Sequence, residues 1–350
     1  MRATFGEWLI AMSMALWLGA AAVATEDAPQ PEPQESSTAA PAESGQETES
    51  AESAAPTEST GPAEPAPLPE FDQAEIVRGQ RERLEPIRQQ LRVMLHAGES
   101  DHFLLFSDLD SRVRNAVLIW LEDSRAKLIA QLGIDPRQRL WDGKCLVLVF
   151  AKQESLAAFA EEFDDHHVQK PRGYFVMESR RSTDPRLVHV ATFQPIRGGN
   201  EALREVLVHE TTHALIELYR KSAPLPLWVH EGLAEYMTVL MDPTLRPAKQ
   251  AGAFTVATAT PYAGIQDIFT RTFAADNLAA YSVSMSLIEC LYSIDASGVL
   301  HLVEALKDGV EPEQALGRAY PGLTYAELER RWQTFCMRFY RPAVKEDKGR

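Results

Sequence analysis

Residues 200–220 read NEALREVLVHETTHALIELYR, and this stretch decides how the rest of the chain is organised. Apolar residues recur every three or four positions through it, which predicts a largely buried helix. At its centre lies HETTH, residues 209–213. Positions i and i+4 of a helix share one face, so His209 and His213 can reach the same ion, while Glu210 is offset toward a water on that ion. Burying these three polar residues without a partner is costly, so we expect a metal there.

The spacing of HETTH alone also arises by chance, and a second stretch strengthens the prediction. Residues 228–236 read WVHEGLAEY, and seventeen residues separate Glu231 from His213. A second helix could present Glu231 as a third ligand. Two histidines and one glutamate are a common catalytic zinc set, which leaves a fourth position open, so we predict Zn²⁺. Glu235, one turn further on, could accept the free N–H of a ligand imidazole or simply face solvent.

The two stretches together resemble the gluzincin zinc metallopeptidases, most closely the peptidase MA-like subgroup with HExxH followed by W-x-x-EG-x-AE. The resemblance runs from about residue 102 to residue 339. It implies a zincin-like metalloprotease fold, Glu210 as the general base, and a tyrosine that stabilises the oxyanion. Tyr281 is the candidate for that tyrosine, with Tyr262 as its rival.

One departure from the zinc aminopeptidases within this group concerns the substrate's amino end. Their Gly-x-Met-Glu-Asn signature is replaced here by VMES, residues 176–179. Glu178 could anchor a free amine, or it could be a hairpin-end carboxylate in solvent, the reading that we favour. The strand expected over residues 187–193 could be an edge that pairs with an extended peptide.

The function predicted from these residues is zinc-dependent hydrolysis of a peptide bond by a metal-activated water, with Glu210 as the base. The partner is then a peptide or protein substrate. Two alternatives stay open. One is an exported zinc-containing domain without protease activity that binds peptide or cell-envelope components, and the other is a zinc amidohydrolase for non-peptide amide bonds.

The pattern around these motifs predicts an α+β fold. Short apolar runs predict strands at residues 102–107, 145–150, 173–178 and 187–193. Helical periodicity is seen over residues 72–96, with a possible break at Pro86, over 113–132, closed by Gly133, and over 155–163. We expect residues 71–340 to form one peptidase domain. Its first half, 71–220, should hold a mixed sheet and the active-site helix, and its second half, 221–340, should be helical.

The N-terminal region has the features of an export signal and a linker. An apolar run and Ala22-Val23-Ala24 predict a signal peptide over residues 1–24, or else an uncleaved anchor. We expect the protein to bind a membrane only if this segment is an uncleaved anchor. Residues 25–70 hold 11 acidic residues and no Lys or Arg, and their Pro, Ala, Glu, Ser and Thr predict a disordered linker. The tail, residues 341–350, is also expected to be disordered. We therefore expect an exported bacterial protein, periplasmic or extracellular.

Charge and cysteine content exclude other classes of protein. The net charge of −15 argues against a nucleic-acid partner, which needs a basic surface. Residues 71–350 are near neutral, with 38 acidic and 34 basic residues. Cys145, Cys290 and Cys336 are too few for a disulfide framework, so either one bridge or three buried thiols is expected.

Overall fold

The computed structural model describes residues 71–165, 172–178, 184–220, 223–259, 265–270 and 277–341. The predicted signal peptide and linker lie outside these residues, as do all but the first residue of the predicted tail and the alternative oxyanion donor, Tyr262. The three cysteines are all described, and all three are buried free thiols, which settles the choice between a bridge and thiols.

The described part of the chain contains a five-stranded mixed sheet in the order β1-β2-β3-β5-β4. Its strands are β1 (His96–Glu99), β2 (Phe103–Ser107), β3 (Cys145–Phe150), β4 (Gly173–Met177) and β5 (Val188–Phe193). The pairs β2–β3 and β3–β5 are parallel, whereas β1 and β4 run antiparallel to their neighbours. The four predicted strands are confirmed, and β1, whose sequence HAGE has little apolar character, was missed.

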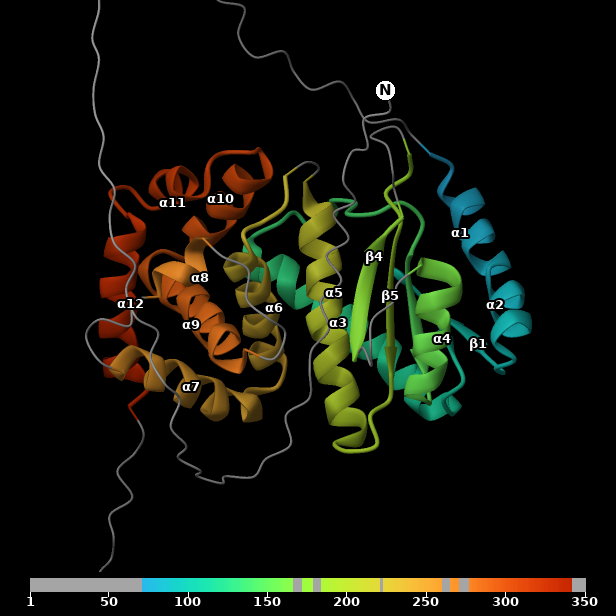
Figure 1. Cartoon of the computed structure of the whole chain (residues 1–350). Coiled ribbons are helices and arrows are strands. Elements are labelled where there is room, and N and C mark those ends of the chain that lie inside the picture. Colours follow the sequence, from blue (N-terminus) through green and yellow to red (C-terminus); the bar gives the residue numbers. More distant parts are fainter. Residues whose placement is uncertain are drawn as a thin grey trace, which may run out of the picture. The chain divides into compact units, whose positions relative to one another are not determined.

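The central strand β3 explains how the sheet divides the core. Its sequence CLVLVF is apolar at every position because both faces are covered. Cys145, Val147 and Val149 face the larger core under α3 (Ser111–Leu132) and α5 (Gly199–Tyr219). The alternate residues face a smaller core under α2 (Leu84–Leu91) and α4 (Gln153–Asp164). Figure 1 shows α3 and α5 on one side of the sheet and α1, α2 and α4 on the other.

The helices of the first half begin and end close to where the sequence predicts. The pattern over residues 72–96 is interrupted, as expected: α1 (Gln73–Glu82) and α2 are separate helices joined at Arg83, and Pro86 lies in the first turn of α2. Helix α3 ends at Gly133, whose φ of 74° is left-handed and suits glycine. The helical pattern was extended too far, because residues 92–95 form no helix and β1 follows them.

After β5 the described residues contain helices and no strand, so the predicted helical half is confirmed at this level. Its α-helices, which form a layered bundle beyond α5 in Figure 1, are α6 (Leu227–Met241), α7 (Arg246–Thr258), α8 (Gln266–Thr270), α9 (Leu278–Ile294), α10 (Ala296–Lys307), α11 (Pro312–Ala319) and α12 (Tyr325–Phe339). The core of this bundle is closed by a buried hydrogen bond of 2.7 Å from Trp332 Nε1 of α12 to Ser286 Oγ of α9.

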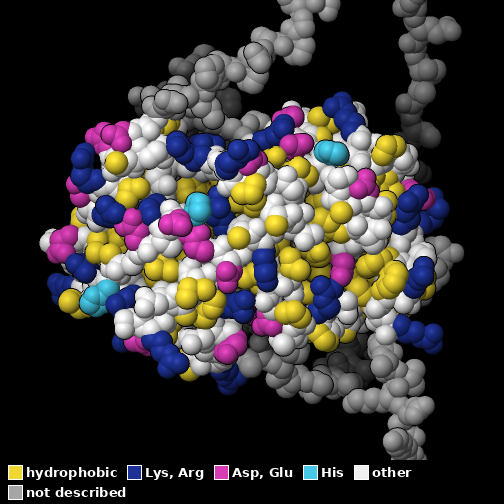
Figure 2. Space-filling view, turned by 180° about the vertical axis from the view of Figure 1, so that it is seen from behind, with side chains coloured by type: hydrophobic (Ala, Val, Ile, Leu, Met, Phe, Trp, Pro, Cys, Tyr) yellow, Lys and Arg dark blue, Asp and Glu magenta, His cyan; other side chains and the backbone are white. Residues whose placement is uncertain are grey.

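No helix in the described ranges has the length and apolar content that a transmembrane span requires. On the face seen in Figure 2, acidic and basic side chains are interspersed with apolar ones. This mixture agrees with the near-neutral charge of residues 71–350.

The sheet order corrects the sequence-based view of the last two strands. Strand β5, which we expected at the edge, lies between β3 and β4, so it cannot take up an added strand. Strand β4 is the edge strand instead. The prediction of β5 as the edge strand is wrong because the strands do not follow chain order in the sheet. β4 precedes β5 in sequence, but β5 pairs with β3 and β4 lies at the edge.

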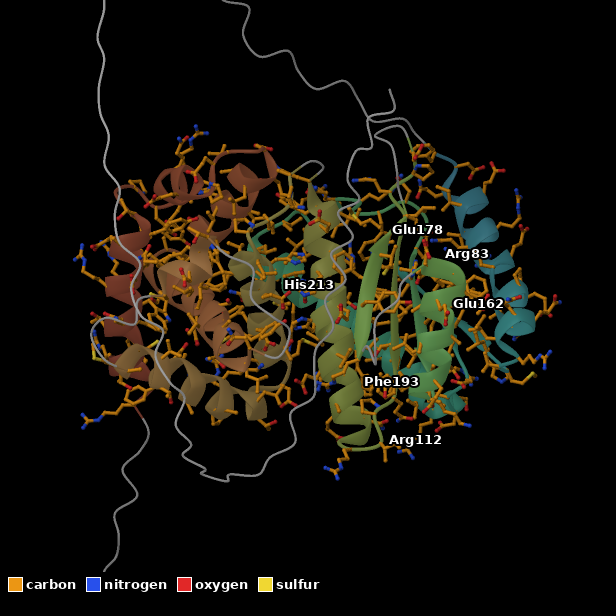
Figure 3. All side chains as sticks on the ribbon, in the orientation of Figure 1. Arg83, Arg112, Glu162, Glu178, Phe193 and His213 are labelled. Atoms are coloured by element: carbon orange, nitrogen blue, oxygen red, sulfur yellow. The ribbon has the colours of Figure 1, made fainter. Side chains whose placement is uncertain are left out.

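A buried ionic network connects these two strands to the helices on the far side of the sheet. The ring of His189 on β5 is 1% exposed and lies 3.0 Å from Asp164 Oδ2 and 2.8 Å from Glu178 Oε1. Arg83 Nη1 contacts the same Glu178 oxygen at 2.6 Å, and the Tyr174 hydroxyl donates to Asp164. Figure 3 shows Arg83 and Glu178 near one end of the sheet, on the side away from His213.

This network corrects the expectation that Glu178 is a solvent-facing carboxylate. Burial by itself would raise the pKa of Glu178, but the hydrogen bond and charge of His189, together with Arg83, lower it to about 2. Burial likewise opposes the charged form of His189, yet its two carboxylate partners raise its pKa above the ordinary value of 6.5. Glu178 is therefore paired with His189 and Arg83 at a half-buried position and does not offer a free carboxylate to a substrate amine.

We expect the His189 network to make stability depend on pH. Because the folded-state pKa of His189 is raised, its contribution is complete below pH 6.5 and is lost as pH rises through the folded pKa. The free energy of unfolding of His189→Gln should therefore fall furthest below that of the wild type near pH 6, with a smaller difference at pH 9. Urea unfolding at both pH values measures this, with His301→Gln, at an exposed position of α10, as the control. A difference that grows toward pH 9 would contradict it.

Candidate metal centre

Helix α5 carries the first part of the site in its buried middle. The helix lies against β4 and β5 on one side and against α6 on another, which explains why its sequence is apolar on nearly all faces. His209 and Glu210 are 1% exposed and His213 is fully buried. The two imidazoles, one turn apart, lie in edge-to-face contact with ring centroids 4.6 Å apart. The predicted pairing of His209 and His213 is therefore present.

Helix α6 brings in the third residue. It begins after Pro226, and Glu231 in its second turn is fully buried. The neighbouring residue, Gly232, lies against the backbone of α9, where an added Cβ would come within 2.5 Å of the Ser284 carbonyl oxygen. No larger residue fits there without movement of a helix. The close contact between α6 and α9 thus fixes the position of Glu231.

The donor atoms of His209, His213 and Glu231 converge on one point. The two Nε2 atoms are 3.0 Å apart, and each lies 3.3 Å from an oxygen of Glu231, Oε2 for His209 and Oε1 for His213. Ligands bound tetrahedrally to zinc at about 2.0–2.1 Å lie roughly 3.3 Å from one another. The spacing of the three side chains therefore fits one small metal ion between them.

Polar atoms without hydrogen-bond partners support the same interpretation. Both carboxylate oxygens of Glu231 are buried, and among the described residues neither accepts a hydrogen bond. The Nδ1 atoms of His209 and His213 are likewise buried and without a hydrogen bond there. A carboxylate in this setting is costly unless a cation compensates it. The residues present fit a metal ion well.

The electrostatics of the cluster favour the charged forms. Burial by itself lowers the pKa of His209, but close contact with Glu231 and the charges of the surrounding carboxylates raise it to about 9. Burial by itself raises the pKa of Glu231, but the charges of His213 and His209 hold it well below its usual range. A proton and a metal ion thus compete for the same imidazole, so metal binding should release protons.

Glu210 lies beside the three donors, and the edge strand approaches it closely. Its Oε2 is buried and has no hydrogen-bond partner among the described residues. Burial raises the pKa of this carboxyl, while His209 and His213 act in the opposite direction. An added Cβ on Gly173, the first residue of β4, would lie 3.1 Å from Glu210 Cγ. The edge strand therefore starts directly against the candidate base.

Four residues near the site complete its surroundings. Glu235 Oε1 lies 3.8 Å from His209 Nδ1, and its Oε2 lies 2.6 Å from Lys249 Nζ. Because the side chain of Glu235 is 1% exposed, solvent is excluded as its environment. The His230 ring stacks on His213 with centroids 4.1 Å apart, and Phe175 of β4 packs against both rings.

Sequence analysis did not predict that Lys249 and Phe175 lie next to the residues of the site. Neither belongs to a motif. The signal for Phe175 was its place in the predicted strand over residues 173–178, whereas Lys249 lies 18 positions beyond Glu231 and gave none.

Of the two candidate oxyanion donors, Tyr281 lies within the described residues. Tyr281 is 2% exposed and lies at the end of the first turn of α9, the helix that packs on α6. Its role stays a prediction. Tyr262, its rival, falls outside the described residues.

The close packing of α6 on α9 leads to a test of how Glu231 is held. Gly232→Ala should destabilise the metal-free protein by about 2 kcal/mol, as overpacking typically does, and should also weaken zinc binding. Urea unfolding and a zinc titration measure the two effects. Gly317→Ala in α11 is the control, because the nearest atom to its added Cβ is 3.7 Å away. Wild-type stability and zinc affinity in Gly232→Ala would show that α9 does not set the position of Glu231.

Comparison with known proteins adds no family to this description. No protein-family model matches the chain, and no curated protein matches it either. The site is therefore defined by its own residues: His209, His213 and Glu231 converge as possible ligands of one ion, with Glu210 and Glu235 beside them.

Proposed function

We propose that the chain is a zinc-dependent peptidase of the gluzincin type. One observation carries the proposal: two imidazole nitrogens and a carboxylate converge within 3.0–3.3 Å in a buried site, with the carboxylate of Glu210 beside them. Two histidines and a glutamate are the ligands of many catalytic zinc sites, whereas structural zinc sites mostly use cysteine. The three cysteines of this chain are free thiols, and none belongs to the cluster.

In this proposal three residues of the site bind the metal ion and a fourth transfers a proton. His209 and His213 offer their Nε2 atoms, and Glu231 offers a carboxylate oxygen, which leaves a tetrahedral ion one open position. Zinc, when bound, supplies a Lewis acid that polarises a carbonyl and lowers the pKa of water to about 7. The buried Oε2 of Glu210 has no hydrogen-bond partner among the described residues, and in this proposal Glu210 takes the proton of the attacking water. It then passes that proton to the leaving amine as the C–N bond breaks.

The edge strand β4 is the surface on which we expect the peptide to lie. Gly173 at its start contacts Glu210, and the ring of Phe175 is 5.7 Å from that of His213. An extended peptide added to β4 by backbone hydrogen bonds would pass the candidate ligands and the base. This replaces β5, which the sheet order excludes.

Strand addition predicts which peptides are cleaved. A linear peptide should be turned over, whereas the same peptide N-methylated on either side of the scissile bond should be cleaved far more slowly, because it loses backbone donors. Proline-rich and cyclic peptides should also be poor substrates. Mass spectrometry of a mixed peptide library with the zinc-loaded protein measures this. Equal cleavage of the linear and N-methylated forms would exclude pairing with β4.

The same library tests the proposed function itself. The expected result is peptide cleavage that stops when a chelator removes the metal and returns when zinc is added. Bound zinc without cleavage of any peptide would contradict the peptidase. The exported zinc domain without protease activity would then be favoured, and activity on other amides would favour the amidohydrolase.

A further inference from the structure

Lys249 forms an ion pair with Glu235, the residue that lies next to His209 of the candidate metal centre. It lies in the first turn of α7, and its Nζ is 2.6 Å from Oε2 of Glu235. The other oxygen of Glu235, Oε1, is the one directed at His209, 3.8 Å from Nδ1. Lys249 and Glu235 are 16% and 1% exposed at the side chain, so water contributes little to this contact. Lys249, Glu235 and His209 thus form a chain of contacts from α7 through α6 to α5.

We infer that Lys249 is a positioning residue for the metal centre and acts through Glu235. By holding Oε2, the ammonium group turns Oε1 toward His209 and prevents the carboxylate from rotating away. An imidazole that binds a metal through Nε2 must carry its proton on Nδ1, and an acceptor there fixes the ring and strengthens the ligand. This inference rests on the proposed zinc site, but it does not require that the protein cleaves peptides.

A second buried Lys–Glu pair provides a matched control. Lys307 Nζ on α10 lies 2.7 Å from Oε2 of Glu217 on α5, the helix that also carries His209. The two pairs have the same chemistry and nearly the same distance, but Glu217 lies on α5 whereas Glu235 lies on α6. Glu217, however, lies beyond His213 near the end of α5 and contacts neither histidine of the site in the described contacts. A loss of metal affinity caused only by removal of a buried lysine should therefore be seen in Lys307→Met as well.

The experiment is a zinc competition titration of the full chain against a chromophoric chelator. The variants are Lys249→Met, Lys249→Arg, Glu235→Gln, the double variant Lys249→Met/Glu235→Gln, and Lys307→Met. Loss of an outer partner of a zinc ligand typically costs 10- to 100-fold in affinity, so we expect Lys249→Met to raise the Kd for zinc about tenfold. Lys249→Arg keeps a cation beside Oε2 and should recover part of the loss. The visible spectrum of the Co²⁺-loaded protein should change in Lys249→Met and not in Lys307→Met.

The double variant shows whether Lys249 works through Glu235. If it does, Lys249→Met/Glu235→Gln loses no more affinity than Glu235→Gln alone, because the two changes break the same chain of contacts. Losses that add, a wild-type Kd in Lys249→Met, or an equal loss in Lys307→Met would each overturn the inference. A wild-type protein that binds no zinc would remove the site and this inference together. A wild type that binds zinc but cleaves nothing would contradict only the peptidase, since affinity is measured here.

Discussion

Replacing Glu231 with alanine is expected to lower the affinity for zinc more than the roughly 10- to 100-fold that loss of an outer partner costs, because a direct ligand is removed. Glu231 supplies the only carboxylate in the described three-residue cluster, and its oxygens lie 3.3 Å from both imidazole nitrogens. Two histidines would remain, which is fewer than the three protein ligands of a catalytic zinc site. Competition against a chelator measures the change.

The control for this experiment is Glu201→Ala, at an exposed position in the first turn of α5. It removes one carboxylate from the ligand-bearing helix without touching the site, so its Kd for zinc should equal that of the wild type. Circular dichroism shows whether Glu231→Ala remains folded. A folded Glu231→Ala protein with wild-type affinity would mean that the metal, if bound, is held elsewhere.

Replacing Glu210 with glutamine is expected to leave zinc binding intact and to lower kcat by about 10²- to 10⁴-fold, the usual contribution of a general base. Glutamine has the shape of glutamate but cannot accept a proton at the position of Oε2, which is buried and without a hydrogen-bond partner among the described residues. The matched measurement is zinc content together with turnover of the best library peptide.

Glu205→Gln serves as the control for Glu210, because it makes the same change one and a half turns earlier on α5 at a half-buried position. It should retain both zinc and activity. Glu210→Gln with wild-type turnover would exclude this residue as the base. A joint loss of zinc and activity would instead assign Glu210 a role in holding the metal.

The candidate ligand cluster could be predicted from the sequence because helical spacing is local. His209 and His213 are one turn apart on any α-helix, so HETTH predicts their shared face without knowledge of the fold. Glu231 could be predicted as a third ligand because α6 begins only a few residues after the end of α5. The apolar run CLVLVF also identified the central strand, since burial on both faces leaves no polar position.

The features that could not be predicted from the sequence depend on contacts between residues far apart in the chain. The order β3-β5-β4 is set by how the strands pair across the sheet, and chain order misled us about which strand is the edge. The partners of Glu178 come from α1–α2 and β5, which periodicity cannot bring together. Lys249 meets Glu235 of α6 although α7 packs mainly against α9 and α12, and no motif marks that contact.

Zinc K-edge X-ray absorption of the purified, zinc-loaded protein tests the central claim most directly. The account predicts one tightly bound zinc per chain, surrounded at about 2.0–2.2 Å by nitrogen and oxygen donors, with the scattering of two imidazoles and without sulfur. A shell at about 2.3 Å from thiolate sulfur, a spectrum without imidazole scattering, or the absence of bound zinc would contradict a centre built from His209, His213 and Glu231.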